Sequence, residues 1–263
     1  MVARARSGAV ETPPPLEAVG LTRALAPVAR GWRLGLLGGF RLQHDGIDVA
    51  VPLSAQRLLA FLAIHSDAHQ RAFVAGGLWT DFSGHHANAS LRTTLWRLRT
   101  LDCELIVSSK NELALHSTLA VDLHEARRCA QDVIRHIGPA DVAVHVLLDH
   151  GELLPDWYED WVLVEREHYR QVRLHALEKL CDELVLRGAY AAAVDAALAC
   201  VAADPLRESA HRAVIKVHLA EGNLSDAIRQ FRFYEALVHE RLGLQPSTEI
   251  RLMIERCFPA TVV

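Results

Sequence analysis

Three arginines, Arg92, Arg97 and Arg99, lie in one short stretch of the chain that contains no acidic side chain. An arginine can neutralise a phosphate, and it can also donate two parallel hydrogen bonds to the edge of a guanine. Thr93 adds a hydroxyl that can donate to a base edge and a methyl that can touch a thymine. Trp96 adds an aromatic surface that can pack against sugar or methyl groups. Together these residue types fit a surface that binds double-stranded DNA.

The same stretch, residues 87–100, has the periodicity of a helix. The apolar positions that share one stripe are Leu91, Leu95 and Leu98. At about 100° per residue, Thr93 and Trp96 lie on the opposite side, flanked by Arg92 and Arg97. Such a face can enter the major groove of DNA. The alternative is a solvated basic helix whose tryptophan packs against a neighbouring element, and this stretch alone leaves both interpretations open.

Residues with metal-binding or phosphate-binding chemistry lack the partners that such sites need. The chain has 15 histidines, of which His85 and His86 are the densest pair. No second set of ligands follows at the spacing of a zinc site, and His65 and His69 lack the glutamate of the HExxH pattern. No GxxxxGK[ST] phosphate-binding loop occurs either. We therefore expect neither a metal nor a cofactor.

Carboxylates surround two tryptophans further along the chain. The residues are Asp156, Trp157, Glu159, Asp160 and Trp161. Paired carboxylates beside aromatic rings can form the active site of a sugar-cleaving enzyme. The simpler interpretation is the polar start of a helix, with the tryptophans packed between linker helices and a repeat domain. We expect no enzymatic activity.

Short elements around the arginine-rich helix predict how it is presented. Strands are expected over residues 33–37, 40–43 and 47–51, helices over 54–66 and 72–79, and further strands over 104–108 and 112–116. Ser54 is predicted as the N-cap of the first helix and is counted with the DNA-binding residues. Lys110, at the tip of the last hairpin, is positioned to meet a phosphate or the minor groove. A small sheet, three helices and a terminal hairpin make a winged helix-turn-helix, in which the third helix enters the groove.

The last third of the chain repeats itself with a period of 34 residues. Gly188 and Ala193 are matched by Gly222 and Ala227, 34 places later. That period is the length of a tetratricopeptide (TPR) unit, two antiparallel helices joined by a short turn. The glycine allows the backbone to turn, and the alanine lets the two helices approach closely. Pro205 ends the first unit, because proline cannot continue a helix.

Charge is distributed unevenly along the chain. Residues 1–30, which we expect to form a flexible tail, have a net charge of +2, residues 31–117 carry +1, and residues 118–263 carry −7. We expect a mainly α fold with a small β part, in which a winged helix-turn-helix domain (31–117) precedes an all-α, TPR-like domain (118–263). A partner that carries phosphates is expected to bind the first half of the chain rather than the second.

Several features favour a cytoplasmic protein without membrane contact. No apolar run reaches the roughly 18 residues of a membrane span, and no signal peptide is evident. The cysteines are an odd number without a CxxC pair: Cys103, Cys129, Cys181, Cys200 and Cys257. This pattern favours reduced thiols, with those in helices acting as small core residues.

Several motifs follow one another between Trp32 and Leu252. They are Leu34-Gly-Leu-Leu-Gly-Gly-Phe40, Leu78-Trp79, the Leu-Arg…Leu-Trp-Arg-Leu-Arg helix, Val121-Asp122-Leu123, Trp157…Trp161…Glu165-Arg166, Asp204-Pro205-Leu206-Arg207-Glu208 and Leu242-Gly-Leu-Gln-Pro-Ser247. In order and spacing they resemble the short form of the Streptomyces antibiotic regulatory protein (SARP) family. In that family an OmpR-type winged helix precedes a bacterial transcriptional activator domain (BTAD).

The resemblance implies a transcription activator. Such a protein binds direct repeats upstream of a promoter, as a side-by-side pair on DNA, and contacts subunits of RNA polymerase. Two alternatives remain open: a TPR-type adaptor whose winged helix binds protein, and a ligand-responsive regulator whose helical domain holds a small molecule. The near-neutral charge of residues 31–117 is the main argument for the adaptor.

Overall fold

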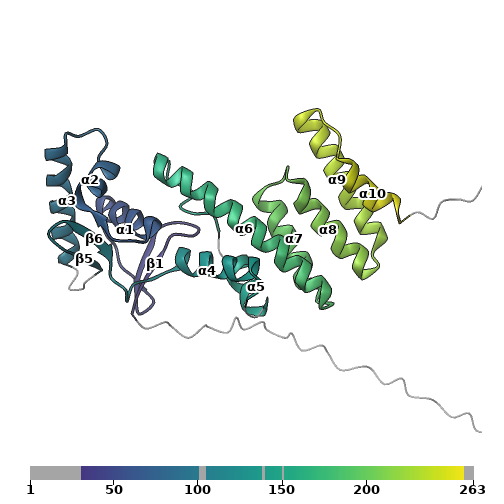
Figure 1. Cartoon of the computed structure of the whole chain (residues 1–263), viewed down its shortest axis with the longest axis horizontal. Coiled ribbons are helices and arrows are strands. Elements are labelled where there is room, and N and C mark those ends of the chain that lie inside the picture. Colours follow the sequence, from purple (N-terminus) through teal and green to yellow (C-terminus); the bar gives the residue numbers. More distant parts are fainter. Residues whose placement is uncertain (1–30, 101–104, 138–139, 150, 258–263) are drawn as a thin grey trace, which may run out of the picture.

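The computed structural model describes residues 31–100, 105–137, 140–149 and 151–257 (Figure 1). The predicted N-terminal tail, Cys103 and Glu104 at the start of a predicted strand lie outside this part of the chain. The described residues are mainly helical with two small sheets, which confirms the predicted fold class. Among these helices, none is both long enough and apolar enough to cross a membrane.

The N-terminal half contains three helices held between two sheets. The helices are α1 (Leu53–His65), α2 (Arg71–Leu78) and α3 (Gly84–Arg99). The first sheet has the order β3 (Ile47–Asp48), β2 (Arg41–His44), β1 (Trp32–Gly35) and β7 (Ala120–Val121), with β7 parallel to β1. The second has the order β4 (His69–Gln70), β6 (Glu112–Leu115) and β5 (Ile106–Ser108), all antiparallel. This is the predicted winged helix, with β5 and β6 as the wing.

The rest of the chain is helical. Its elements are α4 (Asp122–Ile134), α5 (Ala140–Asp149), α6 (Asp160–Leu186), α7 (Tyr190–Ala203), α8 (Glu208–Glu221), α9 (Leu224–Leu242) and α10 (Thr248–Glu255). Gly188 and Gly222 turn the chain before α7 and α9 with φ of +73° and +87°, a backbone region that other residues rarely adopt. Ala193 and Ala227 are fully buried where the paired helices meet. These positions confirm the predicted 34-residue repeat.

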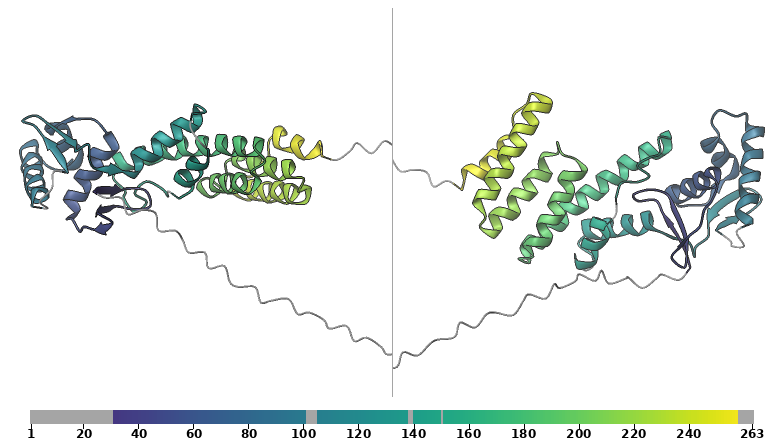
Figure 2. Two further views of the ribbon diagram at one scale, coloured as in Figure 1. Left: turned by 90° about the horizontal axis from the view of Figure 1, so that it is seen from below. Right: turned by 180° about the vertical axis from the view of Figure 1, so that it is seen from behind.

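Equivalent positions of consecutive repeats contact one another directly. Lys216 Nζ of α8 donates to Asp182 Oδ1 of α6 at 2.7 Å, and Arg170 Nη1 of α6 donates to Asp204 Oδ2 at 2.9 Å. The partners are 34 residues apart in both pairs. The stack of α6 to α9 that results is visible from behind in Figure 2.

Helix α6 belongs to both halves of the molecule. Val162 and Tyr169, in its first half, are buried in the same core as Leu34 and Phe61 of the winged helix. Its second half, from Leu174 onward, is buried with α7 and α8 in a separate core. Because each residue adds about 1.5 Å, the 27-residue helix spans about 40 Å. Figure 1 shows α6 running from the winged helix to the repeats.

The two tryptophans before and within α6 lie elsewhere than predicted. Trp157 stacks on Phe40 with ring centroids 6.1 Å apart, and Trp161 meets Phe61 edge-on at 5.2 Å. Both therefore pack against the winged helix rather than between linker helices and repeats. The prediction was wrong because the start of α6 lies against α1 and the loop after β1, a contact that the local sequence does not encode.

Two cysteines fill the core of the repeats, as predicted. Cys181 and Cys200 are completely buried. Burial raises the pKa of both thiols to about 12. The thiolate forms that would make them reactive are therefore strongly disfavoured.

Candidate nucleic-acid interface

Helix α3 has one buried and one exposed face. The buried residues are Ala87, Leu91, Thr94, Leu95 and Leu98. They include every leucine of the predicted stripe. The helix begins at Gly84, somewhat before the predicted range of 87–100, because Ser83 in the extended conformation precedes its first turn.

The predicted site residues of α3 lie on the other face. Arg92, Thr93, Arg97 and Arg99 are all exposed. Trp96 is 67% exposed. An indole that packed against a neighbouring element would be largely covered, so this exposure argues against the packed tryptophan of the alternative interpretation. The Oγ1 of Thr93 donates to the carbonyl of Ala89 at 3.1 Å, which leaves the hydroxyl lone pairs for an outside donor.

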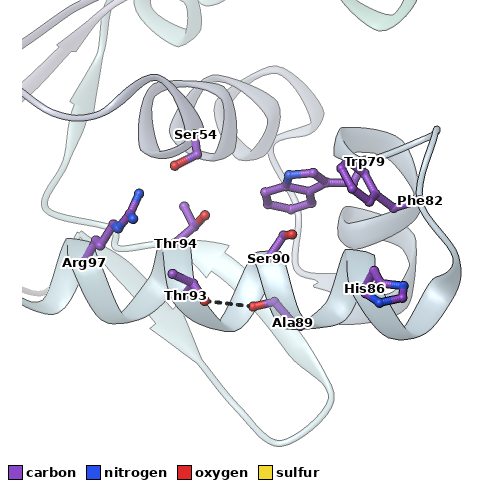
Figure 3. A pocket seen from close by; sticks show the side chains of 9 residues that line it. All are labelled: Ser54, Trp79, Phe82, His86, Ala89, Ser90, Thr93, Thr94 and Arg97. Carbon is purple, nitrogen blue, oxygen red and sulfur yellow. Dashed lines mark hydrogen bonds between the residues drawn. The ribbon is translucent and has the colours of Figure 1, made fainter.

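A groove of about 370 Å³ runs beside this face (Figure 3). It is lined by Ser54, Trp79, Phe82, His86, Ala89, Ser90, Thr93, Thr94 and Arg97. These residues come from α1, from the connection between α2 and α3, and from α3 itself. No lining residue is acidic. A phosphodiester can therefore approach the groove without meeting a carboxylate.

Ser54 lines this groove but does not cap α1. The helix begins at Leu53, and the carbonyl of Pro52 accepts hydrogen bonds from the N–H groups of Ala55 and Gln56 at 2.8 and 3.0 Å. The predicted N-cap was wrong because the fixed φ of Pro52, −58°, lets the helix start directly after it. The Ser54 side chain makes no cap hydrogen bond and faces the groove instead.

Lys110 is exposed at the tip of the wing. The turn beneath it is fixed by Ser109, whose Oγ accepts a hydrogen bond from the N–H of Glu112 at 2.9 Å. Arg71, the first residue of α2, donates to Ser108 Oγ at 2.9 Å and so ties the wing to the helices. The structure thus fixes the wing against α2, while the side chain of Lys110 extends into solvent.

The cations of the interface have no acidic partner in the part of the chain that the structure describes. Within the described residues, no carboxylate forms an ion pair with Arg92, Arg97, Arg99 or Lys110. Half of the other arginines in the described residues, nine of eighteen, do form ion pairs. Arg57, for example, pairs with Glu159 at 3.0 Å. Unpaired exposed cations can exchange their counterions for phosphates, which is the main source of DNA affinity.

Sequence reasoning missed part of the groove. Trp79, Phe82, His86 and Ser90 were not predicted as site residues. Trp79 and Phe82 follow α2 and His86 lies at the start of α3, where no periodicity indicates which side chains converge, whereas Ser90 lies within the periodic stretch. The Nδ1 of His86 lies 2.8 Å from Ser83 Oγ, which fixes the ring at the start of α3. The nearest signal was the Leu78-Trp79 motif, which suggested a family but not a contact.

Comparison with known proteins identifies the second half of the chain. Residues 141–257 match the family model of the bacterial transcriptional activator domain. We refer to this matched region as the BTAD. This domain comprises α5 to α10 in the structure, with α4 between it and the winged helix. No curated protein matches the chain significantly in sequence.

A solved structure similar to the whole fold is that of Mycobacterium tuberculosis EmbR in complex with a low-affinity phosphopeptide. The two chains are 20% identical, with a TM-score of 0.65, and the similarity covers 87% of this chain. This chain spans 65% of the length of the EmbR chain. With a winged helix in front of its BTAD, the protein has the SARP architecture, which confirms the predicted resemblance. The family points to transcription regulation rather than to a class of enzymes.

Proposed function

We propose that the protein is a cytoplasmic, sequence-specific DNA-binding activator of transcription. Helix α3 enters the major groove, the wing meets the flanking backbone, and the BTAD side contacts RNA polymerase. The proposed DNA-contacting residues are Ser54, Arg92, Thr93, Trp96, Arg97, Arg99 and Lys110. In this arrangement Arg92 and Arg97 bond to bases, while Ser54 and Lys110 hold the phosphate backbone.

The observation that carries this proposal is the uncovered face of α3. It combines exposed arginines that have no acidic partner among the described residues, an exposed tryptophan and a groove whose lining has no carboxylate. A helix that served only to fill the core would cover its aromatic residue or pair its cations. The match of residues 141–257 to a transcriptional activator domain supports the same function from the other half of the chain.

The protein is proposed to bind as a side-by-side pair on direct repeats. One winged helix contacts only a few base pairs, so a single copy would be too unspecific to find a promoter. Two copies in the same orientation need a head-to-tail contact rather than a self-complementary one. The net charge of −7 over residues 118–263 disfavours DNA there and favours a protein partner.

Fluorescence polarisation tests the DNA-binding part. The full chain is titrated onto a labelled duplex from the region upstream of its own gene and onto a scrambled duplex, at 50 and 200 mM salt. If about four phosphates are neutralised, affinity falls on the order of 100-fold between the two salt concentrations. The upstream duplex is expected to bind more tightly than the scrambled one. Failure to bind either duplex at low salt would contradict the proposal and favour the protein-binding adaptor.

A further inference from the structure

The first half of α6 has an uncovered apolar surface on its outer side. Tyr158, just before the helix, is 77% exposed, Val164 is 67% exposed, and Leu163 is 40% exposed. Leu163 and Val164 follow the first residue of the helix, Asp160, at the i+3 and i+4 spacing that defines one helix face. We call Asp156, Tyr158, Asp160, Leu163 and Val164 the α6 patch.

The opposite side of this helix is firmly held, so the exposure of the α6 patch is not the result of a loose helix end. Val162 is fully buried in the core of the winged helix. Arg166 donates to the carbonyl of Leu153 at 2.8 Å and to that of Trp157 at 2.6 Å. Glu165 accepts a hydrogen bond from Arg127 of α4 at 2.7 Å. The patch is therefore a rigid surface presented beside the winged helix.

The charges around the patch favour a basic partner. Asp156 and Asp160 are exposed, and neither makes an ion pair within the described residues. Glu167, one turn further on, is ionised, because hydrogen bonds from Arg170 and Gln171 lower the pKa of its carboxyl to about 2. Its charge is partly neutralised by Arg170. The acidic character therefore lies at the Asp156 end, and such a surface repels the DNA backbone.

We propose that the α6 patch docks a basic protein surface that carries an apolar side chain, and that this surface belongs to RNA polymerase at the promoter. The inference rests on the proposed function and names the site of its protein contact. DNA is disfavoured as the occupant by the two unpaired carboxylates. The patch lies beside the winged helix, so a partner bound to the adjacent promoter DNA can reach it.

The size of the patch fits a transient contact. Within the helix, from Asp160 to Val164, the patch extends only about 6 Å, far less than a permanent interface requires. A weak contact of this kind becomes effective when both proteins sit on one DNA molecule, because the tether raises their effective concentration. The patch can then select promoter-bound polymerase without holding free polymerase tightly.

Substitutions on one helix provide the test and its control. Val164→Arg places a cation where the basic partner docks, and Tyr158→Ala removes the largest apolar contact. Leu186→Arg is the matched control, because Leu186 is 87% exposed at the far end of the same helix. The full-length variants are first compared by circular dichroism and by operator titration. Neither measurement is expected to change by more than about twofold, because none of these residues lies at α3 or the wing.

Two readouts then measure the contact itself. One is the affinity of each variant for purified RNA polymerase, with and without a promoter fragment. The other is single-round transcription from that promoter. Val164→Arg and Tyr158→Ala are expected to weaken polymerase binding and to lower transcription by about tenfold each, as for a central contact residue. Leu186→Arg is expected to match the wild type. Asp156→Lys should also weaken binding and reduce its dependence on salt.

The possible failures are distinguishable. Equal polymerase binding by Val164→Arg and Leu186→Arg would overturn the assignment of the patch, as would a wild-type protein that does not bind polymerase on promoter DNA. If Val164→Arg lost self-association but still bound polymerase, the occupant of the patch would be a second copy of the chain. That result would also overturn the assignment of the patch to polymerase. The wild type could also fail to bind the operator while it binds polymerase, and Val164→Arg could lose that polymerase binding. This result would contradict the DNA-binding proposal but support the assignment of the patch.

Discussion

The carboxylate of Asp122 binds the backbone N–H of Leu36, 86 residues earlier in the chain, at 2.9 Å from Oδ1 and 3.0 Å from Oδ2. The N–H of Leu37 donates to the same carboxylate at 3.0 Å. Asp122 is only 8% exposed, and it is the first residue of α4. A single buried side chain thus joins the first strand region of the winged helix to the helix that leads into the BTAD.

Asp122→Ala is expected to destabilise the protein by about 2–3 kcal/mol, because it leaves buried N–H groups without an acceptor. Urea unfolding of the full chain measures the loss. Glu125→Ala, one turn further on α4, is the control, because Glu125 makes only a half-exposed ion pair with Arg33 at 3.7 Å. It should cost less than about 1 kcal/mol. Similar losses in both variants would contradict the structural role of Asp122.

Gly77→Ala is expected to destabilise the winged helix by about 1–3 kcal/mol. A Cβ on Gly77 would lie 2.8 Å from Cε2 of Phe61, a ring that is 1% exposed and packed against Trp161. Gly76→Ala is the matched control on the same helix, because its Cβ meets nothing within 4 Å. It should stabilise α2 by about 0.5–1 kcal/mol. The opposite signs, measured by thermal or urea unfolding, are the discriminating result.

Arg97→Ala and Arg92→Ala are each expected to weaken operator binding by about 1–3 kcal/mol and to relax the preference for one base pair. The measurement is a competition titration with operators substituted at single positions. Arg251→Ala removes an exposed arginine from α10 and should leave operator affinity unchanged. If both α3 variants keep the wild-type affinity and base preference, α3 is not the helix that recognises DNA.

The spacing of the two DNA half-sites tests the side-by-side pair. Half-sites one helical turn apart, about 10–11 base pairs, place both copies on one face of the duplex. Inserting five base pairs should rotate one copy to the opposite face and abolish cooperative binding. Inserting a full helical turn should place both copies on the same face of the duplex again, but farther apart, so that the contact between them is weakened. Footprinting of both half-sites measures this, and unchanged occupancy after the five-base-pair insertion would mean independent binding.

His211 is expected to make the stability of the repeats depend on pH. The imidazole is fully buried, with Nε2 at 2.9 Å from the carbonyl of Pro205 and Nδ1 at 2.9 Å from Nε2 of Gln230. The carbonyl fixes the proton on Nε2, and Nδ1 then accepts the hydrogen bond from Gln230. Burial lowers the pKa of His211, because the charged form loses its hydration.

The sign of the effect follows from this lowered pKa. Below pH about 6.5 the unfolded chain protonates His211 before the folded protein does. The stability that the neutral imidazole contributes to the folded protein is therefore complete above pH about 6.5. It is lost as the pH falls through the lower pKa of His211 in the folded protein. Urea unfolding of the wild type and of His211→Gln between pH 7.5 and 5 measures this, with exposed His175→Gln as control. The wild type should lose more stability on acidification than His211→Gln, and parallel curves would contradict the prediction.

The periodic parts of the fold could be predicted from the sequence, whereas contacts between distant segments could not. The spacing of Leu91, Leu95 and Leu98 predicted the buried stripe of α3, and the pair Gly188 and Gly222 predicted the repeat. The strands β4 and β7 were missed because two residues are too short to show an alternating pattern. The packing of the tryptophans depends on which face of α6 meets the winged helix, and local sequence does not contain that information.

The candidate interface was predictable only as far as helix geometry determines it. Arg92, Thr93, Trp96 and Arg97 follow from rotation about the axis of α3, and the structure leaves all four exposed. The groove beside them brings together α1, α3 and the connection before α3, so its lining depends on tertiary packing. Ser54 illustrates this limit. The sequence predicted it as the N-cap of α1, whereas in the structure it does not cap the helix and lines the groove.

The shared helix α6 has a mechanical consequence. Neither glycine nor proline interrupts it between Asp160 and Leu186, and both of its halves are anchored in hydrophobic cores. The chain therefore has no hinge along α6 about which the winged helix could swing relative to the repeats. A force applied to the repeats by a bound partner would be transmitted along this helix to the winged helix, the end that we propose faces DNA. To reorient the two halves, a turn of α6 would have to unfold, so the helix holds the winged helix and the repeats at one fixed angle.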